Sequence, residues 1–453
     1  MRPATALFVA AIALTLVVGY LLRDTPGFVV RNPDGSYQGD IVHYVYWTRL
    51  VTLDGIQAAY SGQWPETYAV YPPVTLYGYQ LLGTLYRATQ DARFSLEAAL
   101  GSPWLREGIK AVALAWHLLA ALAIYALVRR RSGADLAGLA AALYVANPAA
   151  LFDVAHWAQP DGAHSVFSVL AVGLISIGNL EAGWAAIALA ALAKPQAVAT
   201  LPLMAIATLR QSGGVAGLVR GGLVGCAVGA LVILPFALTG HLRELLSLPG
   251  AISSVMPVVS ADAHNLWWLL LEPRGIEPLF TTDTARLGGP VSFRLAAGAL
   301  VVAQFVLSYW LYWTHRGGLA EAAALGVLGW FVFTTQAHEN HLFLALPLLA
   351  LAWPTRRGLL LAYAVLTATV LLNMALHDQL LLEALGRSLD DGLVQRLRLL
   401  NAAANVLCFL SWSLAAALRR PGPASVPASR PGQRGGTSQL LLDGSSMRSS
   451  KVL

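Results

Sequence analysis

The sequence has 453 residues, of which 57% are hydrophobic and only 12% are charged, with a mean hydropathy of +0.59. A soluble domain carries about 25% charged residues, so this chain has too few charges for a water-facing surface, and lipid must solvate much of it. Leu and Ala dominate without strict alternation, which favours membrane helices over a β-barrel. The net charge of +6 does not indicate nucleic acid, because the basic residues are dispersed. Cys226 and Cys408 both lie in apolar runs, which argues against a disulfide framework or a metal cluster.

Apolar runs recur along the whole chain and predict an all-α polytopic membrane protein with about twelve membrane helices. The first run, 5–22, follows Arg2 and ends without an A-x-A site, so we expect an uncleaved first span rather than a cleaved signal peptide. The later runs lie at 109–128, 135–152, 163–178, 182–193, 195–209, 215–237, 293–314, 319–335, 341–353, 357–376 and 396–418.

Two interpretations are open at 182–209, which Lys194-Pro195 interrupts. The segment forms either one kinked span or two short helices that meet at Lys194. With two helices, the arginines of the short loops all lie on the side of Arg2. With one span, the later arginines move to the other side. The positive-inside rule favours two helices and places both chain ends in the cytoplasm. Broken helices are tolerated where they line a polar cavity, so the break itself indicates a site.

This topology predicts a membrane domain over 1–420 and a cytoplasmic tail over 421–453, which is rich in Pro, Ser, Gly and Arg and is expected to be disordered. Five segments then lie outside the cell: the long loops 23–108 and 238–292, and the shorter connections 153–162, 336–340 and 377–395.

The long loops have helical spacing rather than strand alternation over 40–60 and 74–100, so we expect amphipathic helices resting at the membrane interface. Aromatic residues suit that level of the bilayer. Those expected there are Trp47, Tyr60, Trp64, Trp104, Trp267 and Trp268.

Three polar groups stand in the first loop and in the turn that follows 135–152. Asp40 precedes an apolar helical segment, and it is either a helix N-cap or a general base that takes a proton from an acceptor hydroxyl. Tyr71-Pro72-Pro73 starts a helix, or places a tyrosine hydroxyl near a sugar. A membrane-edge turn needs one or two polar residues, but this one has more, which indicates function. They are Asp153, His156, Gln159 and Asp161.

Two further polar breaks fall on the same predicted side. Lys194 with Gln196 interrupts a helix, and an isolated lysine in hydrocarbon costs about 2.5–3.5 kcal/mol. A phosphate partner or snorkelling to the surface would offset that cost. His338-Glu339 begins another short helix, where a histidine could bind or protonate a phosphate. The spacing to His341 is not that of a zinc motif, so no metal site is predicted.

These motifs together resemble the dolichyl-phosphate-glucose-dependent glucosyltransferases of N-glycan assembly. Gly39-Asp40 to Trp47 and Tyr71-Pro72-Pro73 are similar to that family's first luminal loop. The stretch Asp153 to Asp161 is similar to its Asp-His-Gly-His-Phe-Gln-Tyr-Asn turn. Lys194-Pro195-Gln196 and Ala337-His338-Glu339-Asn340 resemble its Lys-Gln and Val-His-Glu-Lys segments, in the same order along 38–345.

The resemblance implies a GT-C membrane glycosyltransferase that transfers a hexosyl group, with inversion, from a polyprenyl-phosphate sugar to a lipid-linked or envelope glycan. It implies Asp40 as catalytic base and the pair Lys194 and His338 at the donor phosphate. The chain departs from the family at Val154 and Asn340, and Ala158-Gln159-Pro160-Asp161 is closer to the Gly-Gln-x-Asp turn of bacterial relatives. We therefore expect a prokaryotic cell-membrane enzyme. The expected substrate-binding residues are His43, Tyr71, Asp153, His156, Gln159, Asp161, Gln196 and Glu339.

Two other functions fit part of the sequence. A transporter or flippase would also place ionisable groups on broken helices, but it binds between internal repeats near the midplane, and no convincing inverted repeat is present. A polymerase or ligase of lipid-linked glycans would share the topology and the external site. No cofactor is predicted: a divalent cation could bridge carboxylates and phosphate, but no ligand spacing requires one.

Overall fold

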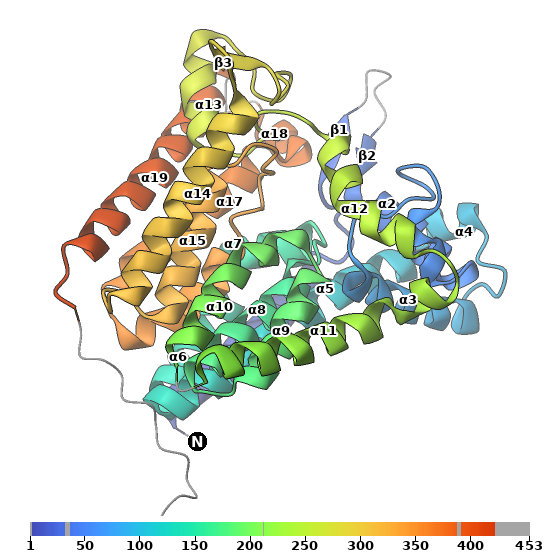
Figure 1. The fold of residues 1–453 in the computed structure, drawn as a ribbon. Helices are drawn as coiled ribbons and strands as arrows, with labels where there is room; N and C mark the ends of the chain where they lie inside the picture. The colour runs from blue at the N-terminus through green and yellow to red at the C-terminus, as the bar shows by residue number, and fades with distance from the viewer. Residues whose placement is uncertain (1, 32–36, 212, 387–390, 422–453) are drawn as a thin grey trace, which may run out of the picture.

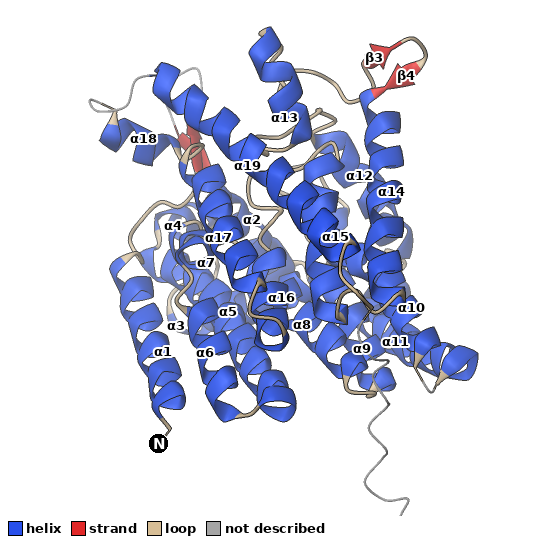
Figure 2. Cartoon of the chain, turned by 90° about the vertical axis from the view of Figure 1, so that its left-hand side faces the viewer, coloured by secondary structure: helices blue, strands red, loops and turns tan. Residues whose placement is uncertain are grey.

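A computed structural model describes residues 2–31, 37–211, 213–386 and 391–421. The described chain is almost entirely helical, with two small strand pairs at one end of a helix bundle (Figures 1 and 2). The predicted tail, 421–453, falls outside the described residues apart from Pro421. Every apolar run predicted from the sequence contains a helix.

The first half of the chain contains the following elements: α1 (Pro3–Leu21), β1 (Val29–Arg31), β2 (Tyr37–Gly39), α2 (Asp40–Leu53), η1 (Ile56–Tyr60), α3 (Pro73–Thr89), α4 (Leu96–Gly101), α5 (Pro103–Ser132), α6 (Ala134–Val145), α7 (Pro148–Leu151), η2 (Phe152–His156), α8 (Asp161–Ser176), α9 (Leu180–Ala191), η3 (Pro195–Thr200), α10 (Leu201–Arg210) and α11 (Gly214–Leu238). The element η2 is a single π-helical turn, and the other η elements are 3₁₀-helices.

The second half contains α12 (Leu242–Val255), α13 (Leu266–Leu271), η4 (Glu272–Arg274), β3 (Arg286–Gly288), β4 (Val291–Ser292), α14 (Phe293–Trp313), α15 (Leu319–Phe333), α16 (Ala345–Ala352), η5 (Trp353–Thr355), α17 (Leu359–Ala375), α18 (Gln379–Leu385) and α19 (Asp391–Ala417). Both strand pairs are antiparallel and very short. The prediction that the long loops lack a sheet therefore misses only these two hairpins.

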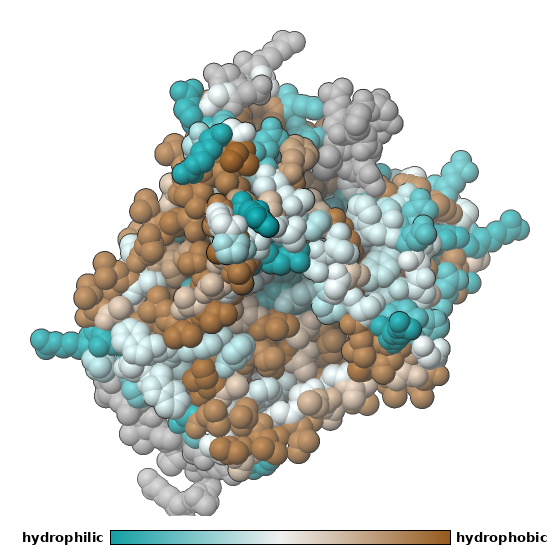
Figure 3. Space-filling view, turned by 45° about the horizontal axis from the view of Figure 1, so that its top comes forward, coloured by the Kyte–Doolittle hydropathy of each residue, from teal (hydrophilic) through white to brown (hydrophobic). Residues whose placement is uncertain are grey.

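The outside of the bundle is apolar, as a lipid-facing surface must be. In the described part of the chain, five helices are long and apolar enough to cross a membrane, or up to seven if each of two bent helix pairs forms one span. Large hydrophobic side chains are exposed along α1, α11, α14 and α19. Figure 3 shows hydrophobic residues over the helices, with paler and hydrophilic residues in the middle of the end that carries the strands. The count of about twelve spans stays a prediction, because several of the helices are shorter than a full span.

The break at Lys194 separates two antiparallel helices. Leu180 at the start of α9 packs against Gly217 near the start of α11, and Leu192 at the end of α9 faces Gly229 further along α11. Helices α9 and α11 therefore run in the same direction, so α10, which joins them, runs in the opposite direction. The prediction of two short helices that meet at this break is confirmed.

Basic residues from different loops gather at the opposite end of the bundle from the strand pairs. Arg356 and Arg419 both pair with the buried Glu321, and Arg316 donates to the backbone of Arg419. Arg131, at the end of α5, donates to Ser176, at the end of α8. Because α8 has 16 residues, its other end at Asp161 lies about 24 Å away. The positive-inside rule predicts that the arginine end faces the cytoplasm, and the polar turns would then share the outer face.

The structure corrects one feature of the outer loops. Trp47, Tyr60, Trp267 and Trp268 are all buried, so they pack inside the protein rather than resting at a membrane interface. Helix α2 likewise buries most of its apolar residues in a cluster shared with α3 and the start of α5. Trp64 is exposed. A buried tryptophan and an interfacial one have the same spacing in sequence, so periodicity alone does not distinguish them.

The orientation of the bundle can be tested by cysteine labelling in intact cells, starting from a Cys226→Ser, Cys408→Ser background. Ala158 and Ala337, which would report on the polar turns, are fully buried. Exposed positions serve better. We expect a membrane-impermeant maleimide to label cysteines at positions 63 and 280 from outside, but not at 318 until the membrane is permeabilised. Labelling of 318 together with 63 would reject the topology.

Candidate active site

Asp40 is the first residue of α2, and its carboxylate is held from one side. Its backbone N–H donates to Phe28, and its Oδ2 accepts a hydrogen bond from Nε2 of Gln159 at 2.5 Å. The Nδ1 of His43 lies 4.0 Å from Oδ1. The Asp40 side chain keeps 28% exposure. Burial raises its pKa to about 6, although the bond from Gln159 and the charge of Lys194 act in the opposite direction.

The turn between η2 and α8 presents Gln159 to this carboxylate. The side-chain oxygen of Gln159 accepts from the hydroxyls of Tyr44 at 2.9 Å and Tyr71 at 3.0 Å. Ala158 adopts a left-handed backbone conformation with φ of 64°. A π-turn and a non-glycine residue in that conformation both occur disproportionately at functional sites.

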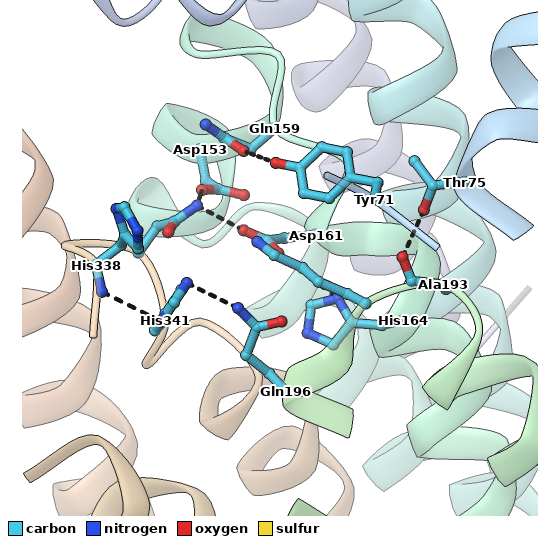
Figure 4. Close-up of polar contacts among 12 residues, drawn as sticks. Tyr71, Thr75, Asp153, Gln159, Asp161, His164, Ala193, Gln196, His338 and His341 are labelled. Atoms are coloured by element: carbon cyan, nitrogen blue, oxygen red, sulfur yellow. Dashed lines mark hydrogen bonds and ion pairs between the residues drawn. The ribbon is translucent and has the colours of Figure 1, made fainter. Parts of the chain in front are cut away.

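Asp161 begins α8 and forms a buried ion pair with Lys194, the residue at the break between α9 and η3. Its other oxygen, Oδ2, accepts from the side-chain amide of Asn340 at 2.8 Å. The same amide lies 3.4 Å from Oδ1 of Asp153. Three polar turns that are distant in sequence thus meet near the ammonium group of Lys194, and Figure 4 shows Asp153 and Asp161 of this group close to the loop that carries His338.

The break at Lys194 is fixed by the start of α3. Val74 donates its backbone N–H to Leu192, and the Thr75 hydroxyl donates to Ala193, both at 2.8 Å. The ammonium of Lys194 lies 5.7 Å from the centre of the Tyr71 ring. This contact joins the Asp40 group to the Asp161 group, so the Tyr-Pro-Pro segment serves both as a helix start and as part of the site wall.

The loop 334–344 closes another side of the site. His338 donates its backbone N–H to Nδ1 of His341 at 3.2 Å, and Nε2 of His341 lies 2.7 Å from the side-chain amide of Gln196 (Figure 4). Burial lowers the pKa of His338 to about 4, and Lys194 adds to that effect. Its imidazole is therefore neutral at pH 7, so it can donate a hydrogen bond from one N–H but carries no positive charge.

Glu339 and Asp262 add two carboxyl groups at this loop. Burial, with repulsion from Asp262 and Asp40, raises the pKa of Glu339 to about 8, so it is protonated at neutral pH. Burial raises the pKa of Asp262 to about 6. The backbone of Asp262 forms an isolated β-bridge with the backbone of His338, and Asp262 has a left-handed φ of 62°. The second long loop thus contributes directly to the site.

His156 is not brought into this group. Its Nε2 lies 2.8 Å from Oδ2 of Asp378, and its Nδ1 lies 3.1 Å from the hydroxyl of Thr25. Trp157 donates to the same Asp378 oxygen at 2.8 Å. This separate cluster ties the first loop and the 377–395 connection to the turn. The ring of His43 stacks on Trp47 and is tilted against Trp64, and burial lowers the pKa of His43.

The other predicted residues meet: Asp40, Tyr71, Gln159, Asp153, Asp161, Lys194, Gln196, His338 and Glu339 form one continuous polar group. Sequence reasoning missed Tyr44, Asp262, Asn340 and His341 as members. The polar run around Asp262 in the second long loop was the available signal. Among the described residues, no group of three or more His, Cys, Asp or Glu is arranged to hold a metal ion.

The fold of the chain is similar to that of several solved structures at low sequence identity. ArnT from Cupriavidus metallidurans in the apo state matches with a TM-score of 0.49 and 14% identity, over 92% of this chain and 77% of ArnT. The same protein bound to undecaprenyl phosphate matches with a TM-score of 0.48 and 15% identity, over 90% and 76%.

The archaeal oligosaccharyltransferase AglB from Archaeoglobus fulgidus, solved with an inhibitory peptide and a dolichol-phosphate, matches with a TM-score of 0.38 and 14% identity, over 92% of this chain and 56% of AglB. No protein-family model and no curated protein matches the sequence. At these scores the similarities assign neither an activity nor a substrate to the chain.

Proposed function

We propose that the chain is a GT-C-type glycosyltransferase that transfers a hexosyl group, with inversion, from a polyprenyl-phosphate sugar to a lipid-linked or envelope glycan at the outer face of a prokaryotic membrane. One observation carries the proposal. The partly exposed carboxylate of Asp40 and the buried ammonium of Lys194 belong to the same continuous group of polar side chains, which we call the polar wall. This wall lies at the bundle end opposite the arginines. That wall offers a base and an anion-binding group at the edge of an apolar helix bundle.

The proposed reaction is a direct displacement. The acceptor hydroxyl oxygen attacks the anomeric carbon, the bond from that carbon to the phosphate oxygen breaks, and Asp40 takes the hydroxyl proton. Polyprenyl phosphate leaves with the additional negative charge. An ammonium has three donors and Asp161 accepts one of them, so Lys194 can also donate to a phosphate oxygen. His338 supports the phosphate with a neutral N–H.

The remaining predicted contacts complete the proposal. Asp153 and Asp161 orient sugar hydroxyls, and His43, Gln196 and Glu339 are the other substrate-binding residues. The lipid chain of the donor lies in the bilayer against the exposed apolar side chains.

The direct test uses purified protein in lipid nanodiscs, a set of synthetic polyprenyl-phosphate hexoses and a lipid-linked glycan acceptor. The expected result is a product whose new linkage has the opposite anomeric configuration to the donor. The transporter alternative predicts another outcome in proteoliposomes: movement of the donor across the bilayer with its sugar–phosphate bond intact and no transfer.

The pH dependence of transfer should be bell-shaped. Asp40 must be ionised to act as base, so kcat/KM should rise as the pH increases through about 6. Glu339 should ionise at a pH of about 8 and place a second negative charge near the phosphate, so kcat/KM should fall above that value. Glu339→Gln should remove the alkaline fall and keep the acidic limb.

The exposed Glu277 provides the matched control, because Glu277→Gln removes a carboxyl of the same type from a surface loop and should leave both limbs in place. A rate that is independent of pH between 5 and 7 would contradict the role of Asp40, since an ionising base imposes a tenfold change per pH unit well below its pKa.

A further inference from the structure

The side-chain amide of Gln159 is fixed in one orientation by its neighbours. Its carbonyl oxygen faces the hydroxyls of Tyr44 and Tyr71, and its NH₂ faces the Asp40 carboxylate. Burial raises the pKa of both tyrosines well above 10, so their hydroxyls keep their protons and can donate. The flipped amide would set an acceptor against a carboxylate, which is unfavourable. Only one orientation of the amide therefore satisfies all three neighbouring groups.

The backbone holds this amide in place. The Gln159 N–H donates to the carbonyl of Asp153 at 3.0 Å, and the preceding Ala158 has the left-handed φ of 64° that turns the chain toward α2. The side chain of Gln159 is only 3% exposed. A left-handed alanine is sterically unfavourable, so the surrounding contacts must enforce the conformation of this turn.

We propose that Gln159 is the positioning residue of the base: its NH₂ group holds Oδ2 of Asp40, and this leaves Oδ1 as the atom that receives the acceptor proton. The assignment of the proton rests on the proposed function, whereas the hold on Asp40 does not. Tyr44 and Tyr71 act behind Gln159, and their role is to fix the amide. Gln159 thus acts through Asp40 rather than on the sugar.

Other groups around Asp40 also influence its ionisation and must be separated from Gln159. His43 on α2 lies near Oδ1 but has a lowered pKa, so it is neutral. Lys194 favours the ionised carboxylate, whereas Glu339 is itself protonated at neutral pH. The groups facing Asp40 are His43 and Tyr44 on α2, Tyr71 and Tyr79 at α3, Gln159 before α8, Lys194 before η3 and Glu339 after α15. Among these, Gln159 is the one with a direct hydrogen bond to Asp40 in the described structure.

The experiment reads the ionisation of Asp40 without any substrate. Full-length protein in nanodiscs is treated with dicyclohexylcarbodiimide across a pH series, because this reagent modifies protonated carboxyls in apolar surroundings. Modification of residue 40 is then quantified by peptide mass spectrometry. Gln159→Glu keeps an acceptor for the two tyrosines but loses the NH₂ donor and adds a charge. Gln159→Leu removes both functions.

In both variants the midpoint for Asp40 should move upward by about one pH unit or more, since a hydrogen bond to the ionised form has been lost. Gln304, also 3% exposed, supplies the control: Gln304→Leu removes a buried amide from α14 and should leave the midpoint unchanged. The acidic limb of kcat/KM should shift with the midpoint in both Gln159 variants, so that transfer partly recovers at higher pH.

An unchanged midpoint in folded Gln159→Leu protein overturns the positioning role, whether or not the wild type transfers sugar. A raised midpoint in a protein whose wild type transfers nothing supports the hold on Asp40 and overturns the proposed function instead. If Gln159→Leu does not fold, Gln159→Met decides the result, because it removes the NH₂ donor without adding the carboxylate of Gln159→Glu, which raises the midpoint by repulsion alone.

Discussion

Asp40→Asn should reduce transfer by at least about 10²-fold, the lower end of what a positioned general base contributes. The fold should persist, because the asparagine oxygen still accepts from Gln159 and the backbone N–H of residue 40 still donates to Phe28. The loss should appear in kcat more than in KM, since the acceptor proton is transferred only in the transition state. Initial rates of sugar transfer at pH 7.5, with thermal unfolding measured in parallel, test this.

Asp54 provides the matched control, since it follows the other end of α2 and is exposed. Asp54→Asn removes the same charge from the same helix and should retain the wild-type rate. Full transfer by Asp40→Asn would reject Asp40 as the base. Loss of transfer with an equal loss of folded protein would instead assign a structural role to Asp40; the predicted alternative of a helix N-cap does not supply that role, because Gly39 is the N-cap of α2 and no side chain caps it.

The sequence predicted the helices well because lipid-facing helices need long apolar runs, and these are visible without any tertiary information. The break at Lys194 was also predictable, because proline and a cation interrupt such a run. The direction of α10 was predicted from the distribution of the arginines alone, by the positive-inside rule. The meeting of Asp40 with Gln159 and of Asp161 with Lys194 had only indirect support, since each motif by itself allowed a structural explanation.

The positions of His156 and Asp262 could not be predicted from the sequence. His156 stands in the polar turn, but a π-turn rotates it toward Asp378 and away from Asp161. A change of helix type moves side chains around the axis by an amount that residue spacing does not encode. Asp262 reaches the site through a long connection whose path depends on a buried partner: Asp283 accepts from Arg294, Thr335 and Gln336 and so fixes the second loop beside His338.

Lys194→Met should destabilise the protein by about 3–5 kcal/mol, because it leaves the buried Asp161 carboxylate without its cation. Combining it with Asp161→Asn should recover most of that loss, since the charge that needed a partner is gone. Thermal unfolding of the single and double variants measures the coupling. Lys110, equally buried but bonded to Thr25 and the Leu22 carbonyl, provides the control. Lys110→Met should destabilise the protein by less than Lys194→Met does. Asp161→Asn should not restore the stability of the Lys110→Met protein.

The double variant also separates the two roles of Lys194. If the lysine only neutralises Asp161, the stable double variant transfers as fast as Asp161→Asn alone. If the lysine also receives the donor phosphate, the double variant folds but transfers at least about 10²-fold more slowly than Asp161→Asn, as expected for loss of a preorganised charge at the leaving group. Wild-type stability of Lys194→Met alone would contradict the neutralising role, because a buried carboxylate would then need no cation. The proposed function predicts the second outcome, because the leaving phosphate gains charge among carboxyl groups, and Lys194 is a buried cation of this site in the described part of the chain.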